Sequence, residues 1–200
     1  MCGRYYLADF TEDEVKEYFS ILEELDKKIK NPSYKGKVKM HGEIFPSDIV
    51  PVIAKSHKNE LKAFGMEWGY TLYNGDRLIN ARSETATEKK TWAIGMNKHR
   101  CLIPASYYYE WEKQSSGKVK HAIHPKGAEV MYMAGVYRTE VDKHVFSILT
   151  REAAPDIEFL HDRMPVILPK EIHEDWLNID NNSHEVIKDA LQYMEHRVAQ

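Results

Sequence analysis

The stretch CLIPASYYYEWE, residues 101–112, carries the clearest fold signal in this chain. Its apolar start, Cys101–Ile103, and its aromatic end, Tyr107–Glu112, are both typical of β-strands. Working outward, similar runs predict strands at residues 1–7, 49–54, 61–70, 77–81, 119–123, 130–137 and 145–149. Helical spacing predicts helices at residues 11–29, within 85–94, and at 155–160, 169–177 and 183–197. This pattern predicts an α+β fold: one compact domain over residues 1–200, with a β-rich, mixed or antiparallel, barrel-like core and peripheral helices.

The composition excludes several classes of protein. The formal net charge of -3 argues against nonspecific coating of nucleic acid, so any DNA binding must come from a local basic patch. No apolar run is long enough to span a bilayer, and charged residues interrupt the N-terminal segment, so we expect no membrane association. We expect a cytoplasmic monomer, associated with the nucleoid if bacterial, in which Cys2 and Cys101 form no structural disulfide.

Cys2 follows the initiator methionine, and its small side chain predicts removal of Met1. The product carries an α-amine and a thiol on adjacent carbons. A neutral amine attacks an aldehyde to give a Schiff base, and the thiol can then close a five-membered thiazolidine. The ring-opened sugar of an abasic site in DNA is such an aldehyde. The competing interpretation is that Cys2 is a small apolar residue of the first strand.

Four motifs occur in order along the chain: MCGRY at 1–5, NARSET at 80–85, RCLIPA at 100–105 continuing to YEW at 109–111, and HDRMPVIL at 161–168. Ala134-Gly135 and ILT at 148–150 lie between them. Together these segments resemble the SOS-response-associated peptidase (SRAP) family, whose members process abasic sites. The resemblance implies a β-rich α+β fold, a positively charged DNA channel and a thiazolidine between the N-terminal cysteine and single-stranded DNA carrying an abasic site.

The resemblance also implies roles for individual residues. Matching motif positions give a catalytic set of Cys2, Asn80, Glu110 and His161, and DNA contacts at Arg4, Trp68, Arg82 and Trp111. One departure is Ser106-Tyr107-Tyr108, where family members commonly have a small turn such as Asp-Gly. Loss of that glycine could alter the turn that places Glu110.

General chemistry supports these roles. Opening the sugar and dehydrating the carbinolamine both need proton transfer, which a carboxyl or imidazole with a shifted pKa can provide. Glu110 lies between two aromatic residues, whose apolar surroundings would raise its pKa; alternatively it is a strand residue facing solvent. His161 could protonate the sugar oxygen, and Asn80 could orient the substrate or the terminal amine unless it is simply a turn residue.

Arginine and tryptophan residues within the motifs suggest how DNA is held. If the motifs converge, Arg4, Arg82 and Arg163 would form a phosphate cradle. Trp68 and Trp111 could stack on bases, although tryptophan is more often a core residue.

Three other functions remain open from the residues alone. Cys2 could act as the nucleophile of a cysteine peptidase that processes its own N-terminus, or its Schiff base could lead to lyase cleavage by β-elimination. A noncatalytic nucleic-acid binding module would use the arginines and aromatics but not Cys2. A metal enzyme is disfavoured because the Cys and His residues lack paired zinc spacing, and we expect no metal and no cofactor.

Overall fold

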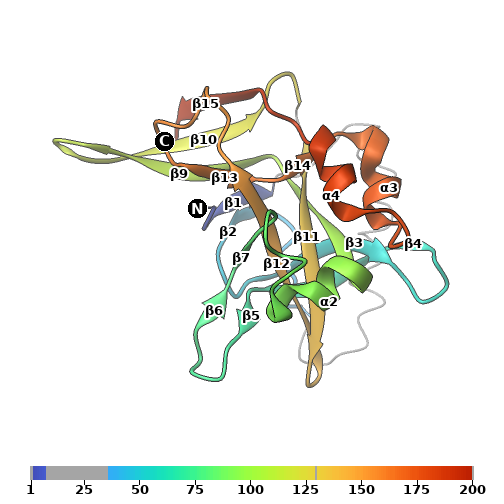
Figure 1. The fold of residues 1–200 in the computed structure, drawn as a ribbon. Coiled ribbons are helices and arrows are strands. Elements are labelled where there is room, and N and C mark those ends of the chain that lie inside the picture. Colours follow the sequence, from blue (N-terminus) through green and yellow to red (C-terminus); the bar gives the residue numbers. More distant parts are fainter. Residues whose placement is uncertain (1, 8–35, 129, 200) are drawn as a thin grey trace.

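Five strands close into a barrel at the centre of the molecule (Figure 1). The structure is a computed structural model that describes residues 2–7, 36–128 and 130–199. In the barrel, β12 pairs with β4 in parallel, and the remaining pairs, β4–β3, β3–β8, β8–β11 and β11–β12, are antiparallel. The barrel strands are β3 (Ile49–Lys55), β4 (Leu61–Trp68), β8 (Arg100–Ala105), β11 (Met131–Glu140) and β12 (Lys143–Glu152).

Alternation of side chains along the barrel strands produces two hydrophobic cores. In β8 every residue is buried, with Cys101 and Ile103 in one apolar cluster and Leu102 in the other. Because successive side chains of a strand point to opposite faces, both faces of β8 must be covered. Gly135 in β11 allows close packing here, since a Cβ at this position would overlap the side chain of Ile103.

A second, five-stranded antiparallel sheet packs beside the barrel in the order β15-β10-β9-β1-β2 (Figure 1). Only Ser106 separates β8 from β9, so residues 100–114 pass directly from the barrel into this sheet. The sheet comprises β1 (Tyr5–Leu7), β2 (Gly42–Ile44), β9 (Tyr107–Gln114), β10 (Gly117–Pro125) and β15 (Met194–Val198). Its inward-facing aromatics meet the barrel core, where the ring centroids of Tyr5 and Trp68 are 5.3 Å apart.

Short elements complete the domain. The helices are α2 (Lys90–Lys98), α3 (His173–Leu177) and α4 (Ser183–Val186), with 3-10 turns at Lys170–Ile172 and Ile187–Asp189. The remaining strands are β5 (Tyr70–Thr71), β6 (Arg77–Leu78), β7 (Asn80–Arg82), β13 (Arg163–Pro165) and β14 (Ile167–Leu168). Trp92 and Trp176, from α2 and α3, are buried in the second apolar cluster on the outside of the barrel. Within the described part of the chain, no helix has the length and apolar character needed to cross a membrane.

The observed elements confirm the expected α+β fold with a β-rich, barrel-like core, and they correct three local predictions. Residues 155–160 form turns instead of a helix. The segment 183–197 is helical only at its start, and its end is the strand β15, paired with β10. The helix expected within 85–94 begins at Lys90 and ends at Lys98. The helix expected at 11–29 lies outside the described residues.

Candidate active site

Cys2 lies just before β1 and is fully buried. Its Sγ is 3.7 Å from the backbone oxygen of Arg4, which in turn accepts a hydrogen bond from the backbone N–H of Tyr109 at 2.9 Å. Burial raises the pKa of the Cys2 thiol far above its ordinary value, and the nearby negative charge of Glu110 raises it further. The thiol is therefore protonated at neutral pH and requires a base before it can act as a nucleophile.

Asn80 is the first residue of β7 and contacts Cys2 directly. The parallel pairing of β7 with β12 places Asn80 opposite Ile148. Its side-chain Nδ2 donates a 2.8 Å hydrogen bond to the backbone oxygen of Cys2. Its Oδ1 is buried and has no hydrogen-bond partner among the described residues. Asn80 therefore fixes the backbone of Cys2 and offers an unused acceptor beside it.

Glu110 reaches the same place from β9. The side chain shares a face with core residue Tyr108, and the residue is 6% exposed. Burial raises the pKa of its carboxyl above the ordinary value, while the charge of His161 opposes this effect. A carboxyl with a raised pKa stays protonated to higher pH than an ordinary one and can pass its proton to a neighbouring group. Glu110 therefore reaches the site even though Tyr107 and Tyr108 stand where a small turn such as Asp-Gly is common.

His161 follows the turns at residues 155–160 and precedes β13. The backbone N–H of Arg163 donates to its Nδ1 at 3.0 Å, and Oδ1 of Asp162 lies 2.6 Å from the same nitrogen. The His161 side chain is 34% exposed, so one part of the ring remains accessible to a substrate. Asp162 was not singled out from the sequence, although its position next to the histidine could have suggested this contact.

The structure thus brings together all four residues of the expected catalytic set. Asn80 bonds to Cys2, while Glu110 interacts electrostatically with both Cys2 and His161. The four residues come from four separate segments of the chain. The cluster joins a thiol, a protonatable carboxyl, an imidazole and an amide, which are the groups that proton-coupled addition to an aldehyde requires.

Arg4 and Trp111, two of the expected DNA contacts, lie together beside this cluster. The Arg4 guanidinium is 5.1 Å from the ring centroid of Trp111 and 4.5 Å from that of Phe45. Glu43 accepts hydrogen bonds from both Arg4, at 3.3 Å, and Lys120, at 2.8 Å. Lys120 was not singled out from the sequence, and it lies directly opposite Trp111 in the β9–β10 hairpin.

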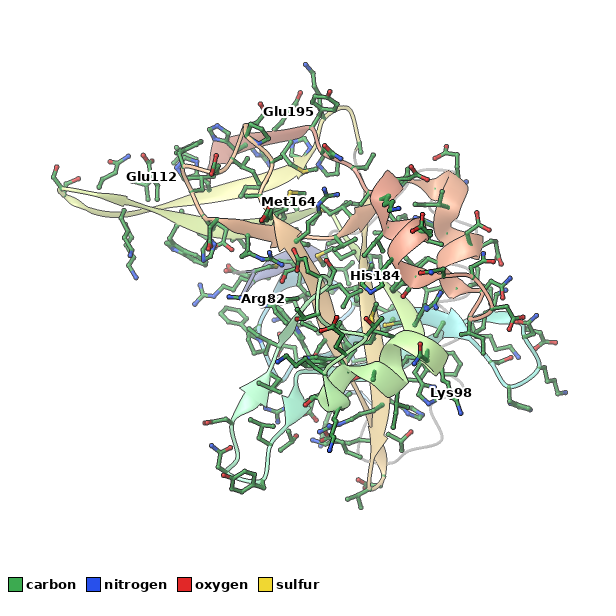
Figure 2. The ribbon with its side chains drawn as sticks, in the orientation of Figure 1. Arg82, Lys98, Glu112, Met164, His184 and Glu195 are labelled. Atoms are coloured by element: carbon green, nitrogen blue, oxygen red, sulfur yellow. The ribbon has the colours of Figure 1, made fainter. Side chains whose placement is uncertain are left out.

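Arg82 and Arg163 differ in their surroundings. Arg82 is exposed at the end of β7 (Figure 2), and its side chain forms no ion pair with the described residues. Arg163 instead donates from Nη1 and Nη2 to the two carboxylate oxygens of Glu84, both at 2.8 Å, and its side chain is only 12% exposed. A phosphate contact at Arg163 stays a prediction, and it would require Glu84 to release the guanidinium that it occupies here.

Trp68 is a core residue and not a surface for bases. It is fully buried, its Nε1 donates to the backbone oxygen of Ile79 at 3.0 Å, and its ring packs against Tyr5 and Phe146. A buried ring has no free face on which a base could stack, so the predicted DNA contact at Trp68 would require the ring to leave the core. By contrast, Tyr73, which is close to Trp68 in sequence and lies in the turn between β5 and β6, is fully exposed.

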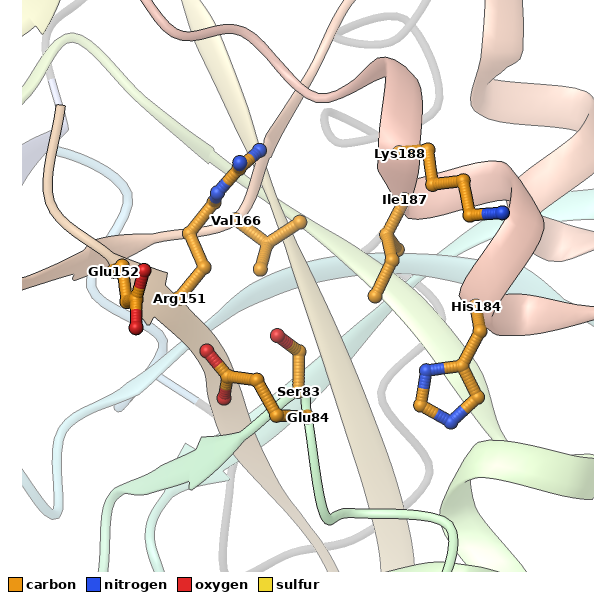
Figure 3. A pocket seen from close by; sticks show the side chains of 8 residues that line it. All are labelled: Ser83, Glu84, Arg151, Glu152, Val166, His184, Ile187 and Lys188. Carbon is orange, nitrogen blue, oxygen red and sulfur yellow. The ribbon is translucent and has the colours of Figure 1, made fainter.

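A pocket of about 390 Å³ lies between β12 and the C-terminal helical region (Figure 3). None of the four clustered residues lines it, so this pocket is separate from the cluster around Cys2. Its lining comprises Ser83, Glu84, Arg151, Glu152, Val166, His184, Ile187 and Lys188. Across the described ranges 2–7, 36–128 and 130–199, no group of three or more His, Cys, Asp or Glu residues is placed to hold a metal ion.

Comparison with known proteins adds an independent observation. The family model described as SOS response associated peptidase (SRAP) matches residues 1–199. The chain is 32% identical over 204 residues to the abasic site processing protein YoqW of Bacillus subtilis, covering 96% of this chain and 87% of YoqW. It is 26% identical over 185 residues to the abasic site processing protein YedK of Escherichia coli, covering 88% of this chain and 79% of YedK.

Solved structures share the fold. A protein from Bordetella bronchiseptica superposes with a TM-score of 0.76 at 20% identity, covering all of both chains. A protein from Bacteroides thetaiotaomicron gives a TM-score of 0.74 at 21% identity, covering 100% of this chain and 92% of the other.

Proposed function

The chain belongs to the SOS response associated peptidase (SRAP) family, and from this premise we propose that it processes abasic sites in single-stranded DNA by covalent capture at Cys2. The observation that carries the proposal is the meeting of Cys2, Asn80, Glu110 and His161 at one place. Relatives that match most of this chain are named abasic site processing proteins, which supports the choice of substrate.

The proposed reaction condenses an aldehyde with an aminothiol. After Met1 is removed, the α-amine of Cys2 attacks C1 of the ring-opened sugar, and the carbonyl oxygen becomes a hydroxyl. That hydroxyl leaves as water after it takes a proton, which gives a Schiff base. The Cys2 sulfur then bonds to C1 of the protonated Schiff base, and the thiol proton goes to the base that protonated the departing hydroxyl. The products are a thiazolidine and one water molecule.

Glu110 is assigned both proton transfers next to Cys2. Because burial raises its pKa, the carboxyl can begin protonated and donate to the departing hydroxyl. The resulting carboxylate then lies close to a thiol whose pKa is raised, and it can accept the thiol proton as sulfur attacks. One residue can therefore act as acid in the first step and as base in the second.

His161 and Asn80 are assigned to the sugar and to the nucleophile respectively. His161 is partly exposed and can protonate the ring oxygen of the closed sugar, which releases the aldehyde. Asn80 holds the carbonyl of Cys2 through Nδ2, and its unused Oδ1 can accept a hydrogen bond from the terminal amine or from a sugar hydroxyl. Positioning of this kind lowers the entropic barrier to attack.

The test mixes purified protein with single-stranded DNA that carries one abasic site and resolves the products on a denaturing gel. Wild type should give a band that survives heat and detergent. Cys2→Ser, and a variant with Glu inserted between Met1 and Cys2 to block the α-amine, should not. Absence of the wild-type band, with mass spectrometry showing a free Cys2 terminus, would overturn the proposal and favour a peptidase.

A further inference from the structure

Four aromatic side chains form a continuous row on the outer face of the five-stranded sheet. Tyr107, Tyr109 and Trp111 alternate along β9, and Tyr6 of β1 pairs with Tyr107 in the register. The ring centroids are 5.0 Å apart for Tyr6 and Tyr107, which stack at 10°, then 5.3 Å from Tyr107 to Tyr109 and 6.4 Å from Tyr109 to Trp111. We call these four residues the aromatic row.

Cations from three segments lie against this row. The Lys120 Nζ is 3.7 Å from the ring centroid of Tyr109, and the Arg197 guanidinium is 5.7 Å from that of Tyr107. Arg4 lies over Trp111 at the other end. Arg197 is exposed and has no acidic partner among the residues that the structure describes. The Tyr6–Tyr107 end therefore combines partly exposed rings with an unneutralised positive charge.

The aromatic row is connected to the site around Cys2 through β9 itself. β1 begins at Tyr5, and its pairing with β9 ends at the bond from Tyr109 N–H to Arg4, directly before Glu110 and Trp111. At that point Glu110 points to the catalytic cluster and Trp111 to the outer face. A single strand that leaves the cluster can pass the start of β1 and continue to the partly exposed rings of Tyr6 and Tyr107.

We propose that the aromatic row is a second binding subsite, which takes the unpaired nucleotides that continue from a captured lesion. Bases would stack on the rings at the Tyr6–Tyr107 end, while Arg197 would contact a phosphate. This combination of rings and cations is how proteins bind single strands without reading sequence. Cross-strand aromatic pairs also stabilise sheets, but that role alone would not require Arg197 beside the rings. The location of the lesion rests on the proposed function.

The test separates flank binding from capture. Fluorescence anisotropy with the full chain would measure affinity for single strands of 5 and 15 nucleotides whose central position is a tetrahydrofuran abasic analogue, which has no aldehyde. Wild type should bind the longer strand more tightly. The double variant Tyr6→Leu, Tyr107→Leu should lose about tenfold or more of its affinity for the 15-mer, with little change for the 5-mer.

Matched variants serve as controls. Tyr107→Phe keeps the ring and should behave as wild type, as should Tyr193→Leu, which changes an exposed tyrosine outside the row. Arg197→Gln should reduce the steepness of log K against log salt by about 0.7 for the 15-mer. This readout does not depend on whether the leucine variants fold. An unchanged preference for the longer strand in the leucine variants, or an unchanged slope in Arg197→Gln, overturns the inference.

Covalent capture of a natural abasic 5-mer, followed in the same variants, distinguishes the two proposals. Normal capture with reduced binding of the 15-mer supports the subsite and confirms that the leucine variants remain folded. No capture by wild type contradicts the proposed function, whereas anisotropy still decides whether the aromatic row binds a single strand.

Discussion

The side-chain amide of Asn80 is hydrogen-bonded to the backbone carbonyl of Cys2 at 2.8 Å, joining residues 78 positions apart in the chain. This bond attaches the N-terminal segment to β7, and through β7 to the barrel strand β12. Cys2 is thus held against the barrel.

Asn80→Ala should slow cross-linking by about 100-fold, because a misplaced nucleophile loses most of the advantage of positioning. Loss of a single hydrogen bond should cost only about 1 kcal/mol of stability. Single-turnover rates from denaturing gels and thermal melting would check both values. Asn74→Ala, which changes a hydrogen bond in an exposed turn, is the control. A wild-type rate in Asn80→Ala would exclude a positioning role for Asn80.

Glu110→Gln should slow cross-linking by about 100-fold or more, because the amide cannot transfer a proton. The stability of the variant should not fall along with its rate of cross-linking. Because burial raises the pKa of Glu110 in the folded chain, its stabilising contribution is fully present below about pH 4.5 and is lost as pH rises through the folded pKa. The variant should therefore melt no lower than wild type at pH 7, with a flatter pH dependence.

Thermal melting of wild type and Glu110→Gln between pH 4 and pH 8 would measure this difference in pH dependence. Glu152→Gln, which changes an exposed glutamate, is the control. Steeper loss of stability with rising pH in Glu110→Gln than in wild type would contradict the assignment.

Cys2→Ser should convert capture into transient Schiff-base chemistry. The variant keeps an α-amine after Met1 removal but cannot close a thiazolidine, so β-elimination can proceed and cleave the DNA. We expect loss of the stable band, trapping by borohydride, and more strand cleavage than with wild type. Cys101→Ala, which changes a buried cysteine in the barrel, should still cross-link. Failure of borohydride to trap Cys2→Ser would argue against attack by the amine.

Arg82→Gln should weaken binding to single-stranded DNA and reduce the salt slope by about 0.7, as expected for the loss of one phosphate contact. Arg163→Gln should leave that slope unchanged and lower the melting temperature by several degrees, since it leaves Glu84 without its bidentate partner. Anisotropy titrations at several salt concentrations would compare the two variants. A reduced slope in Arg163→Gln would show that Arg163 releases Glu84 to bind phosphate.

Local patterns in the sequence were enough to predict most of the barrel. Apolar runs such as residues 49–54 and 145–149 bury both faces, so composition alone marks them as strands. The end of the segment 183–197 was harder. Its residues carry no strong β pattern, and β15 forms because β10 offers an edge with which it can pair. That edge lies about 70 residues away in sequence, where local reasoning cannot find it.

The motifs identified the catalytic set, but not the surroundings of every residue within them. Trp68 and Trp111 are both next to charged residues in sequence, yet one is in the core and the other on the outer face. Likewise, Arg82 and Arg163 look equivalent in the sequence, but the structure ion-pairs Glu84 with Arg163. Burial and charge pairing depend on which strands become neighbours, and spacing along the chain does not report this.

The burial of Cys2 has a consequence for the order of events during synthesis. An aminopeptidase must reach the first two residues, but in the folded chain Cys2 is fully buried and its carbonyl is held by Asn80. The proposed capture requires removal of Met1, and the burial of Cys2 favours removal before the chain folds. The segment that carries His161 leaves the ribosome roughly 160 residues after Cys2, a delay of about 10–30 s at typical rates of translation. The nascent chain thus offers a limited period for the proposed removal of Met1.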